Sequence, residues 1–154
     1  MGIHLSARAI VIHDSKILLN EMGDGAYYNF PGGRIEDYEI ASETVVREVL
    51  EETGHHAEVE NYIFTSDYEP NRHNHSEGDC HRINIFFRCT LKEGAEKEIP
   101  AHPDGDPCDS TLKSKPIWVP FSDLQSIPFV PSAIKNTLIK YLETGIFEPK
   151  YFVC

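Results

Sequence analysis

The chain lacks several features that mark well-defined protein classes. Its 154 residues contain no run of about 18 apolar residues, so the sequence predicts no membrane-spanning helix. The four cysteines are scattered without a Cys-x-x-Cys spacing, which argues against a disulfide framework or a zinc ribbon. No basic segment leads into an apolar one at the start, so we expect no secretory signal. These absences favour a cytoplasmic location.

Positive charge is also scarce. Fourteen Lys and Arg residues face twenty-five Asp and Glu residues, which gives a net charge of −11. Binding to a nucleic-acid backbone needs a basic face, so nucleic acid is not an expected partner. A small anionic substrate is still compatible with this charge, because a bound metal ion reverses the sign of the local field.

What the chain does contain is an apolar fraction of 40%, enough for the core of one domain over residues 1–154. The order of predicted elements is strands, helix, strands, helix. This order indicates an α+β fold with a mixed sheet flanked by helices. The predicted strands are a hairpin over Ala7–Asn20, a short strand at 27–33, one or two strands over Ala57–Tyr68, and strands at His81–Leu91 and Pro116–Phe121.

Two segments have the signals of helices. Ser42–Thr53 has Ser42 as a candidate N-cap and Gly54 as a candidate C-terminal residue. A second helix is predicted to start at Ser132 and to end at Gly145. Polar loops are predicted over residues 69–80 and 92–115.

The first helix carries an unusual acidic face. At about 100° per residue, Glu51, Glu48 and Glu52 lie roughly 40°, 100° and 140° from Arg47. The apolar residues fall on the opposite side and are Val45, Val46, Val49 and Leu50. The helix is therefore amphipathic, with one side suited to packing on a sheet.

A solvated surface helix would also explain outward glutamates, but two details argue against it. Glu51 and Glu52 lie in the last turn, where the helix dipole disfavours anions. Glu48 and Glu52 form a like-charged i, i+4 pair. Both costs become advantages if the face binds a hard divalent cation such as Mg²⁺, which prefers carboxylate oxygens and bridges to phosphates.

The segment from Gly33 to His55 resembles the signature motif of the Nudix (MutT-like) hydrolases, G-x5-E-x7-R-E-U-x-E-E-x-G-U, where U is apolar. Every fixed position is present at the right spacing, and only the last U departs, because it is His55. The fixed residues are Gly33, Glu39, Arg47, Glu48, Glu51, Glu52 and Gly54. The flanking elements are similar to the family's α/β/α sandwich with a mixed sheet between helices.

The resemblance implies metal-dependent hydrolysis of a diphosphate linkage, with Mg²⁺ or Mn²⁺ as the cofactor. The expected substrate is a small anionic nucleoside diphosphate derivative, such as a nucleoside triphosphate or a nucleotide sugar. The implied metal ligands are Glu48, Glu51, Glu52 and the Gly33 carbonyl. The implied catalytic residues are Arg47, Glu48 and Glu51. Glu39 is expected to be structural or to support the metal ligands from outside their own coordination shell.

The general base stays open at this point. Family members use a box glutamate or an acidic residue from a later loop, and Glu69, Glu77 and Asp79 are the loop candidates. Each is equally explained as a solvated loop carboxylate.

Other polar residues near the motif also have two explanations. Arg8 and Arg34 suit phosphate binding, but also simple surface solubility. Aromatic residues such as Phe30 and Tyr68 would stack on a base or pack in the core. The loop with His73, His75 and His81 matches no standard zinc spacing, and a polar loop that faces the substrate explains it better.

An alternative function is a Nudix-fold sensor that binds a nucleotide without cleaving it. The intact set of glutamates argues against this alternative, because a sensor has no need of crowded carboxylates. A homodimer is compatible with a domain of this size, although nothing in the sequence requires one.

Overall fold

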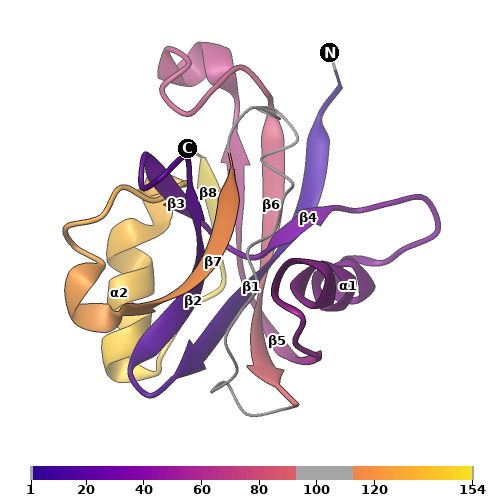
Figure 1. Ribbon diagram of the computed structural model, residues 1–154. Coiled ribbons are helices and arrows are strands. Elements are labelled where there is room, and N and C mark those ends of the chain that lie inside the picture. Colours follow the sequence, from indigo (N-terminus) through magenta and orange to yellow (C-terminus); the bar gives the residue numbers. More distant parts are fainter. Residues whose placement is uncertain (1, 93–112, 154) are drawn as a thin grey trace.

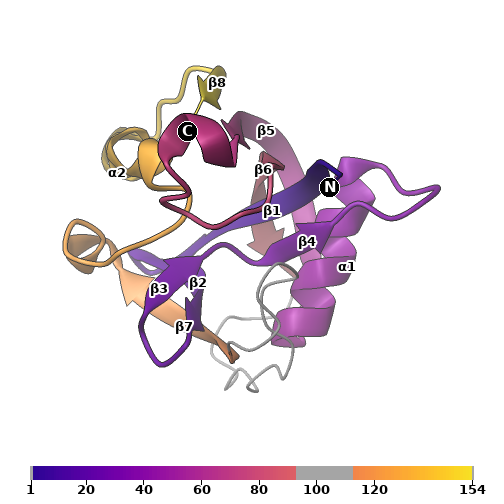
Figure 2. The ribbon, with the colours of Figure 1, turned by 90° about the horizontal axis from the view of Figure 1, so that it is seen from above.

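A computed structural model describes residues 2–92 and 113–153, and it shows a mixed sheet between two helices (Figures 1 and 2). The α+β sandwich predicted from the sequence is therefore confirmed. The strands are β1 (His4–His13), β2 (Lys16–Met22), β3 (Tyr27–Asn29), β4 (Gly32–Arg34), β5 (Ala57–Tyr68), β6 (Arg82–Leu91), β7 (Ser114–Pro120) and β8 (Lys150–Val153). The helices are α1 (Ala41–Thr53) and α2 (Lys135–Thr144), with short 3-10 turns at Pro70–His73, Phe121–Asp123 and Ser132–Ile134.

The predicted N-terminal hairpin forms from β1 and β2 with a two-residue turn. Asp14 and Ser15 both have positive φ angles, 48° and 58°. This pair of left-handed residues matches the twist of antiparallel strands and is the usual geometry for a two-residue hairpin. The hairpin pairs only at its tip, where Ile12 faces Ile17, because the two strands diverge toward different neighbours.

The strand β1 organises the sheet. It runs parallel to β6 along most of its length, and its first half pairs on the other side with β4. The main path of the sheet is β3-β2-β1-β6-β5-β8, with β7 beside β2. The antiparallel pairing of Ala7 with Gly33 and Arg8 with Gly32 fixes the start of the glycine-containing motif against the centre of the sheet.

Alternation along β1 divides the core into two layers. Ala7 and Ala9 pack in the cluster that contains Val45 and Val49 of α1. Ile10, on the opposite side of the strand, packs in the cluster that contains Leu138 of α2. The small alanines leave room for α1 to lie close to the sheet, so the acidic helix is held at a fixed distance from β1 and β4.

The first helix starts one residue earlier than predicted, and Ser42 is not its cap. The N-cap position is Ile40, whose backbone N–H donates to the Glu43 carboxylate at 3.2 Å. An acidic residue three positions along thus satisfies the helix start in place of a serine hydroxyl. Gly54 ends the helix as predicted, in the left-handed conformation with φ 71°. Leu50 is 38% exposed, so the apolar side is narrower than the sequence suggested.

The second helix and the C-terminus also differ in detail from the predictions. Ser132 begins a 3-10 turn instead of α2, and its backbone N–H donates to the Glu77 side chain at 2.8 Å. Gly145 terminates α2 in the left-handed conformation, as expected. The strand β8 was not predicted; it pairs in parallel with β5. Most of the predicted 92–115 loop lies outside the described residues, and β7 already begins at Ser114.

Cysteine pairing is a further difference. Cys80 is disulfide-bonded, which the scattered spacing did not predict, whereas Cys89 is a free, buried thiol. In the described part of the chain no helix is long and apolar enough to cross a bilayer.

Candidate active site

Two glycines bring β4 into direct contact with the acidic helix. A Cβ atom on Gly33 would lie 2.4 Å from the Glu48 Oε1 atom. Gly32 has a φ of 143°, and a Cβ there would lie 2.1 Å from the Ala7 carbonyl oxygen. A side chain at Gly32 would clash with the backbone of β1, whereas one at Gly33 would displace the carboxylate of Glu48. The two glycines therefore let β4 lie against β1 and let Glu48 lie against β4.

Glu52 is the carboxylate held most firmly. Its Oε2 accepts hydrogen bonds from the Asn20 Nδ2 at 3.1 Å and from the Gly32 backbone N–H at 3.0 Å. Burial raises its pKa to about 7, although the positive charge of Arg8 and the two hydrogen bonds act in the opposite direction. Glu52 is therefore a carboxylate whose charge is costly in this environment.

Glu48 lies close to Glu52, and its negative charge is also unfavourable in this environment. Burial raises its pKa, while the Arg47 guanidinium at 2.8 Å lowers it and the neighbouring Glu51 raises it further. Glu51 itself is half exposed. Glu48 thus interacts electrostatically with both Glu51 and Glu52.

Arg47 holds this arrangement together. Its guanidinium donates to both oxygens of Glu39, at 2.6 and 2.9 Å, and it also contacts Glu48, Glu51 and the Arg34 carbonyl. The guanidinium in turn lowers the pKa of Glu39 to about 2. Glu39 also accepts a hydrogen bond from the Thr44 hydroxyl at 2.8 Å. The ion pair between Arg47 and Glu39 therefore links the loop after β4 to the acidic face of α1.

The two arginines that were candidates for phosphate binding lie in different environments. Arg8 lies beside the site: its Nη1 donates to the carbonyls of Phe30 at 3.1 Å and Gly32 at 2.9 Å, and its Nε donates to Asn84. Its charge lowers the pKa of both Glu48 and Glu52. The exposed Arg34 contributes its backbone carbonyl to Arg47.

The three loop carboxylates considered as general bases each have a local partner. Glu69 accepts the backbone N–H of Arg72 at 3.0 Å and starts the 3-10 turn. Glu77 accepts the backbone N–H of Ser132, and Asp79 lies 2.7 Å from His75. Glu69 and Asp79 therefore have partners within the loop, whereas Glu77 reaches Ser132 outside it, and the Glu77 Oε2 is buried without a hydrogen bond from any described residue.

The histidines of this loop are dispersed. His81 contacts Asp67 at 2.7 Å, and His73 stacks on the Tyr68 ring with centroids 5.7 Å apart. Among residues 2–92 and 113–153, no group of three or more His, Cys, Asp or Glu side chains is arranged to hold a metal ion. This statement includes the acidic face, so a cation there would require the carboxylates of Glu48 and Glu51 to turn from Arg47.

The donor chemistry of the acidic face nevertheless fits a hard divalent cation. Glu48, Glu51 and Glu52 interact electrostatically, and burial raises the pKa of two of them. Carboxylate oxygens are the ligands that Mg²⁺ and Mn²⁺ prefer. A cation would relieve the repulsion that the fold imposes on these side chains.

Sequence reasoning missed several polar residues that support the site. Asn20 is buried in β2 directly after the apolar run Ile17–Leu19 and reaches Glu52. Asn84 is buried in β6 and reaches Arg8. The available signal was a polar amide inside an apolar strand, because a buried polar group needs a specific partner.

The fold and the motif define a Nudix-type hydrolase. A family model described as "NUDIX domain" matches residues 3–138, so the chain belongs to this family. Among relatives, a Bacillus subtilis (strain 168) protein named "Putative 8-oxo-dGTP diphosphatase" is 46% identical over 52 residues. That match covers 33% of this chain and 35% of the relative, so the chain spans only about a third of the curated protein it matches.

Solved structures share the fold along nearly the whole chain. A UDP-X diphosphatase superposes with a TM-score of 0.68 at 19% identity, covering 99% of this chain and 68% of that one. An ADP-ribose pyrophosphatase from Streptococcus suis 89-1591 has a TM-score of 0.65 at 20% identity, with 96% and 98% coverage. A MutT protein from Bacillus halodurans has a TM-score of 0.62 at 23% identity, with 97% and 89% coverage. At these identities the similarity establishes the fold alone.

Proposed function

We propose that the chain is a divalent-metal-dependent pyrophosphohydrolase that cleaves the diphosphate linkage of a nucleoside diphosphate derivative. The observation that carries the proposal is the burial of Glu52 against the Gly32 N–H, with Glu48 packed on Gly33 beside it. A fold selected for stability alone would not place two glutamates with raised pKa values side by side. Relatives named as diphosphatases and pyrophosphatases support the same reaction class.

In this proposal Glu48, Glu51 and Glu52 hold the cation, with the Gly33 carbonyl as a further ligand. When bound, a divalent cation neutralises charge on phosphoryl oxygens and lowers the pKa of a coordinated water. Asn20 and the Gly32 N–H keep one oxygen of Glu52 fixed, and the other oxygen would bind the cation. Arg47 orients Glu48 and Glu51, and either of these box glutamates would accept the proton of the attacking water.

The alternative is a Nudix-fold sensor that binds a nucleotide without hydrolysing it. One experiment separates the two functions: incubation with nucleoside triphosphates and nucleotide sugars in millimolar Mg²⁺ or Mn²⁺, followed by detection of phosphate and pyrophosphate products. Hydrolysis that EDTA abolishes supports the enzyme. Binding without product formation over the whole panel supports the sensor.

The matched variants for this assay are Glu52→Gln and Glu43→Gln. Glu43 lies in the first turn of the same helix and caps Ile40, away from the acidic face. We expect Glu52→Gln to lose activity by orders of magnitude and Glu43→Gln to retain it. Homodimerisation and a cytoplasmic location stay predictions, and the disulfide at Cys80 counts against the second.

A further inference from the structure

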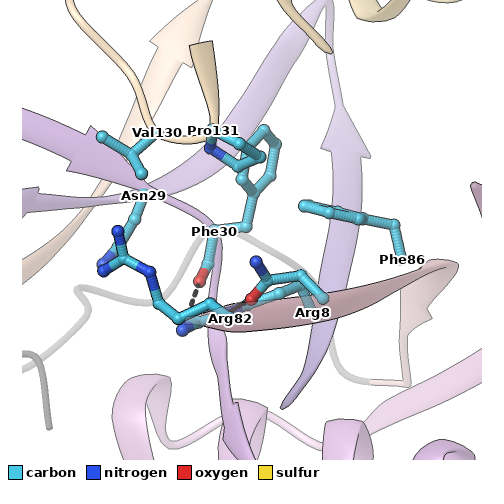
Figure 3. Close-up of a pocket in the computed structure, with 8 residues that line it drawn as sticks. Arg8, Asn29, Phe30, Arg82, Phe86, Val130 and Pro131 are labelled. Carbon is cyan, nitrogen blue, oxygen red and sulfur yellow. Dashed lines mark hydrogen bonds between the residues drawn. The ribbon is translucent and has the colours of Figure 1, made fainter. Parts of the chain in front are cut away.

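Arg8 binds the backbone of the segment that enters the acidic site. Its side chain starts from β1, and its Nη1 donates to the carbonyl of Phe30 at 3.1 Å (Figure 3). The same Nη1 donates to the carbonyl of Gly32 at 2.9 Å. The carbonyl between them, that of Pro31, accepts the backbone N–H of Ala9 at 2.7 Å. Three successive carbonyls are therefore bonded to two neighbouring residues of β1.

These three bonds determine where the Gly32 N–H points. A peptide unit is planar, and in its trans form the carbonyl and the N–H point in opposite directions. The bond from Ala9 to the Pro31 carbonyl therefore directs the Gly32 N–H away from β1. That N–H donates to Glu52 Oε2 at 3.0 Å. Arg8 bonds to the peptide units on either side, which limits the rotation of a glycine whose φ is 143°.

Asn84 fixes the orientation of Arg8. Asn84 lies in β6 and is 6% exposed. Its Oδ1 accepts the Arg8 Nε at 3.3 Å, and its Nδ2 donates at 3.4 Å to the hydroxyl oxygen of Ser66, which is buried in β5. Because both ends of the amide have partners, its oxygen end faces the arginine. A row of polar side chains thus crosses three strands and ends at the backbone that Glu52 contacts.

The same bonds argue against Arg8 as a phosphate ligand. A guanidinium binds phosphate in a bidentate manner through two nitrogens on one of its edges. Each edge of Arg8 that could do so contains Nε or Nη1, and both of these atoms already donate to described residues. An arginine that turned toward a phosphate would release the carbonyls of Phe30 and Gly32.

We propose that Arg8 and Asn84 are positioning residues of the metal site. Asn84 orients Arg8, and Arg8 holds the backbone of residues 30–32. This backbone directs the Gly32 N–H to Glu52, so the carboxylate is ordered before a cation arrives. In this role neither side chain touches the substrate or the cation. The inference rests on the proposed function only for the assignment of Glu52 as a metal ligand.

The test uses variants of the full chain that alter these bonds one at a time. Arg8→Lys keeps the charge and loses the planar group that donates to three oxygens. Asn84→Leu keeps the approximate volume and loses the acceptor, whereas Asn84→Asp keeps an acceptor for Arg8 and serves as the conservative rescue. Arg88→Lys is the matched control, because Arg88 also donates from the sheet to a β1 carbonyl, that of Ile10, at 3.5 Å.

The first measurement is the binding of Mn²⁺ to the nucleotide-free chain, followed by electron paramagnetic resonance of the free ion. We expect Arg8→Lys and Asn84→Leu to weaken Mn²⁺ binding by about tenfold or more, as the loss of a group that supports a metal ligand commonly does. Asn84→Asp and Arg88→Lys should stay within about threefold of the wild type. Unchanged Mn²⁺ affinity in both Arg8→Lys and Asn84→Leu would overturn the inference, because a phosphate ligand would give this result.

The second measurement needs no metal. Hydrogen exchange followed by NMR reports how firmly the Gly32 N–H is bonded, and its rate is compared with the mean rate of the β6 amides in the same variant. Exchange at Gly32 should be about tenfold faster in Arg8→Lys than in the wild type, and unchanged in Arg88→Lys. Arg8→Lys is sufficient for both measurements if Asn84→Leu does not fold.

Gly32 exchange that does not respond to Arg8→Lys would contradict the inference whatever the metal affinity. If the exchange responds but the wild type binds no Mn²⁺, the role of Arg8 in holding residues 30–32 is supported, and only the proposed metal-dependent function fails.

Discussion

Replacing Glu52 with glutamine should stabilise the metal-free protein. The Glu52 pKa is about 7, compared with an ordinary value of 4.5, and this difference corresponds to at most roughly 3 kcal/mol. Because the folded-state pKa is raised, the contribution of Glu52 to stability is fully present below pH 4.5 and is lost as the pH rises through 7. A glutamine does not titrate, and its oxygen can still accept from Asn20 and Gly32.

The assay is urea denaturation in EDTA at several pH values between 4.5 and 8. The free energy of unfolding of the variant, minus that of the wild type, should increase over this window by up to about 3 kcal/mol. Taking the difference cancels other groups that titrate in both proteins. A difference that stays constant across the window would show that burial does not disfavour the Glu52 charge, and the reasoning would fail.

Glu39→Gln provides a comparison of opposite sign. Hydrogen bonds from Arg47 and Thr44 lower the Glu39 pKa to about 2, so its ionised form stabilises the fold above pH 4.5 and that stability is lost as the pH falls toward 2. Glu39→Gln should therefore be less stable than the wild type at pH 7. Adding millimolar Mg²⁺ should stabilise the wild type by mass action and stabilise Glu52→Gln less.

Three further predictions concern the motif and the net charge. Gly33→Ala should displace the Glu48 carboxylate, which lies 2.4 Å from the new Cβ, and lower turnover at least about tenfold with little loss of stability, because a flexible side-chain end can move; kcat near the wild-type value would contradict this. His55→Val should keep activity within about tenfold, since His55 is buried and the family pattern is apolar there; a loss of several hundredfold, above about 3 kcal/mol, would assign the imidazole a catalytic part. Filter binding should detect no affinity for duplex DNA or RNA at physiological salt, because the net charge is −11; micromolar, salt-sensitive binding would refute this.

The periodicity of the sequence was sufficient to predict the helix and the sandwich. The structure confirms that Val45 and Val49 of α1 face the sheet, and it adds that alternation along β1 places Ala7 and Ala9 against them and Ile10 on the opposite side. The helix caps were less predictable. Ser42 had the right residue type, but the helix starts one residue earlier at Ala41, and the carboxylate of Glu43 accepts the backbone N–H of the N-cap residue Ile40.

The supporting residues of the site could not be predicted, because they depend on contacts between distant parts of the chain. Asn20 and Glu52 are 32 positions apart, and Arg8 and Asn84 are 76 apart. No local pattern specifies such pairs. They follow only once the parallel pairing of β1 with β6 is known, since this pairing brings Arg8 opposite Phe86 and next to Asn84.

The acidic face of α1 and the two glycines of β4 are structurally interdependent. Gly32 supplies an N–H to Glu52, Gly33 leaves space for Glu48, and Arg47 ties the same face to Glu39. Neutral side chains at Glu48 and Glu52 would relieve repulsion and desolvation, so the arrangement lowers the stability of the metal-free fold. A binding site can retain such a cost, because ligands that bind only the folded state return stability by mass action. The electrostatic strain of α1 is therefore best explained by the cation and diphosphate that we propose it holds.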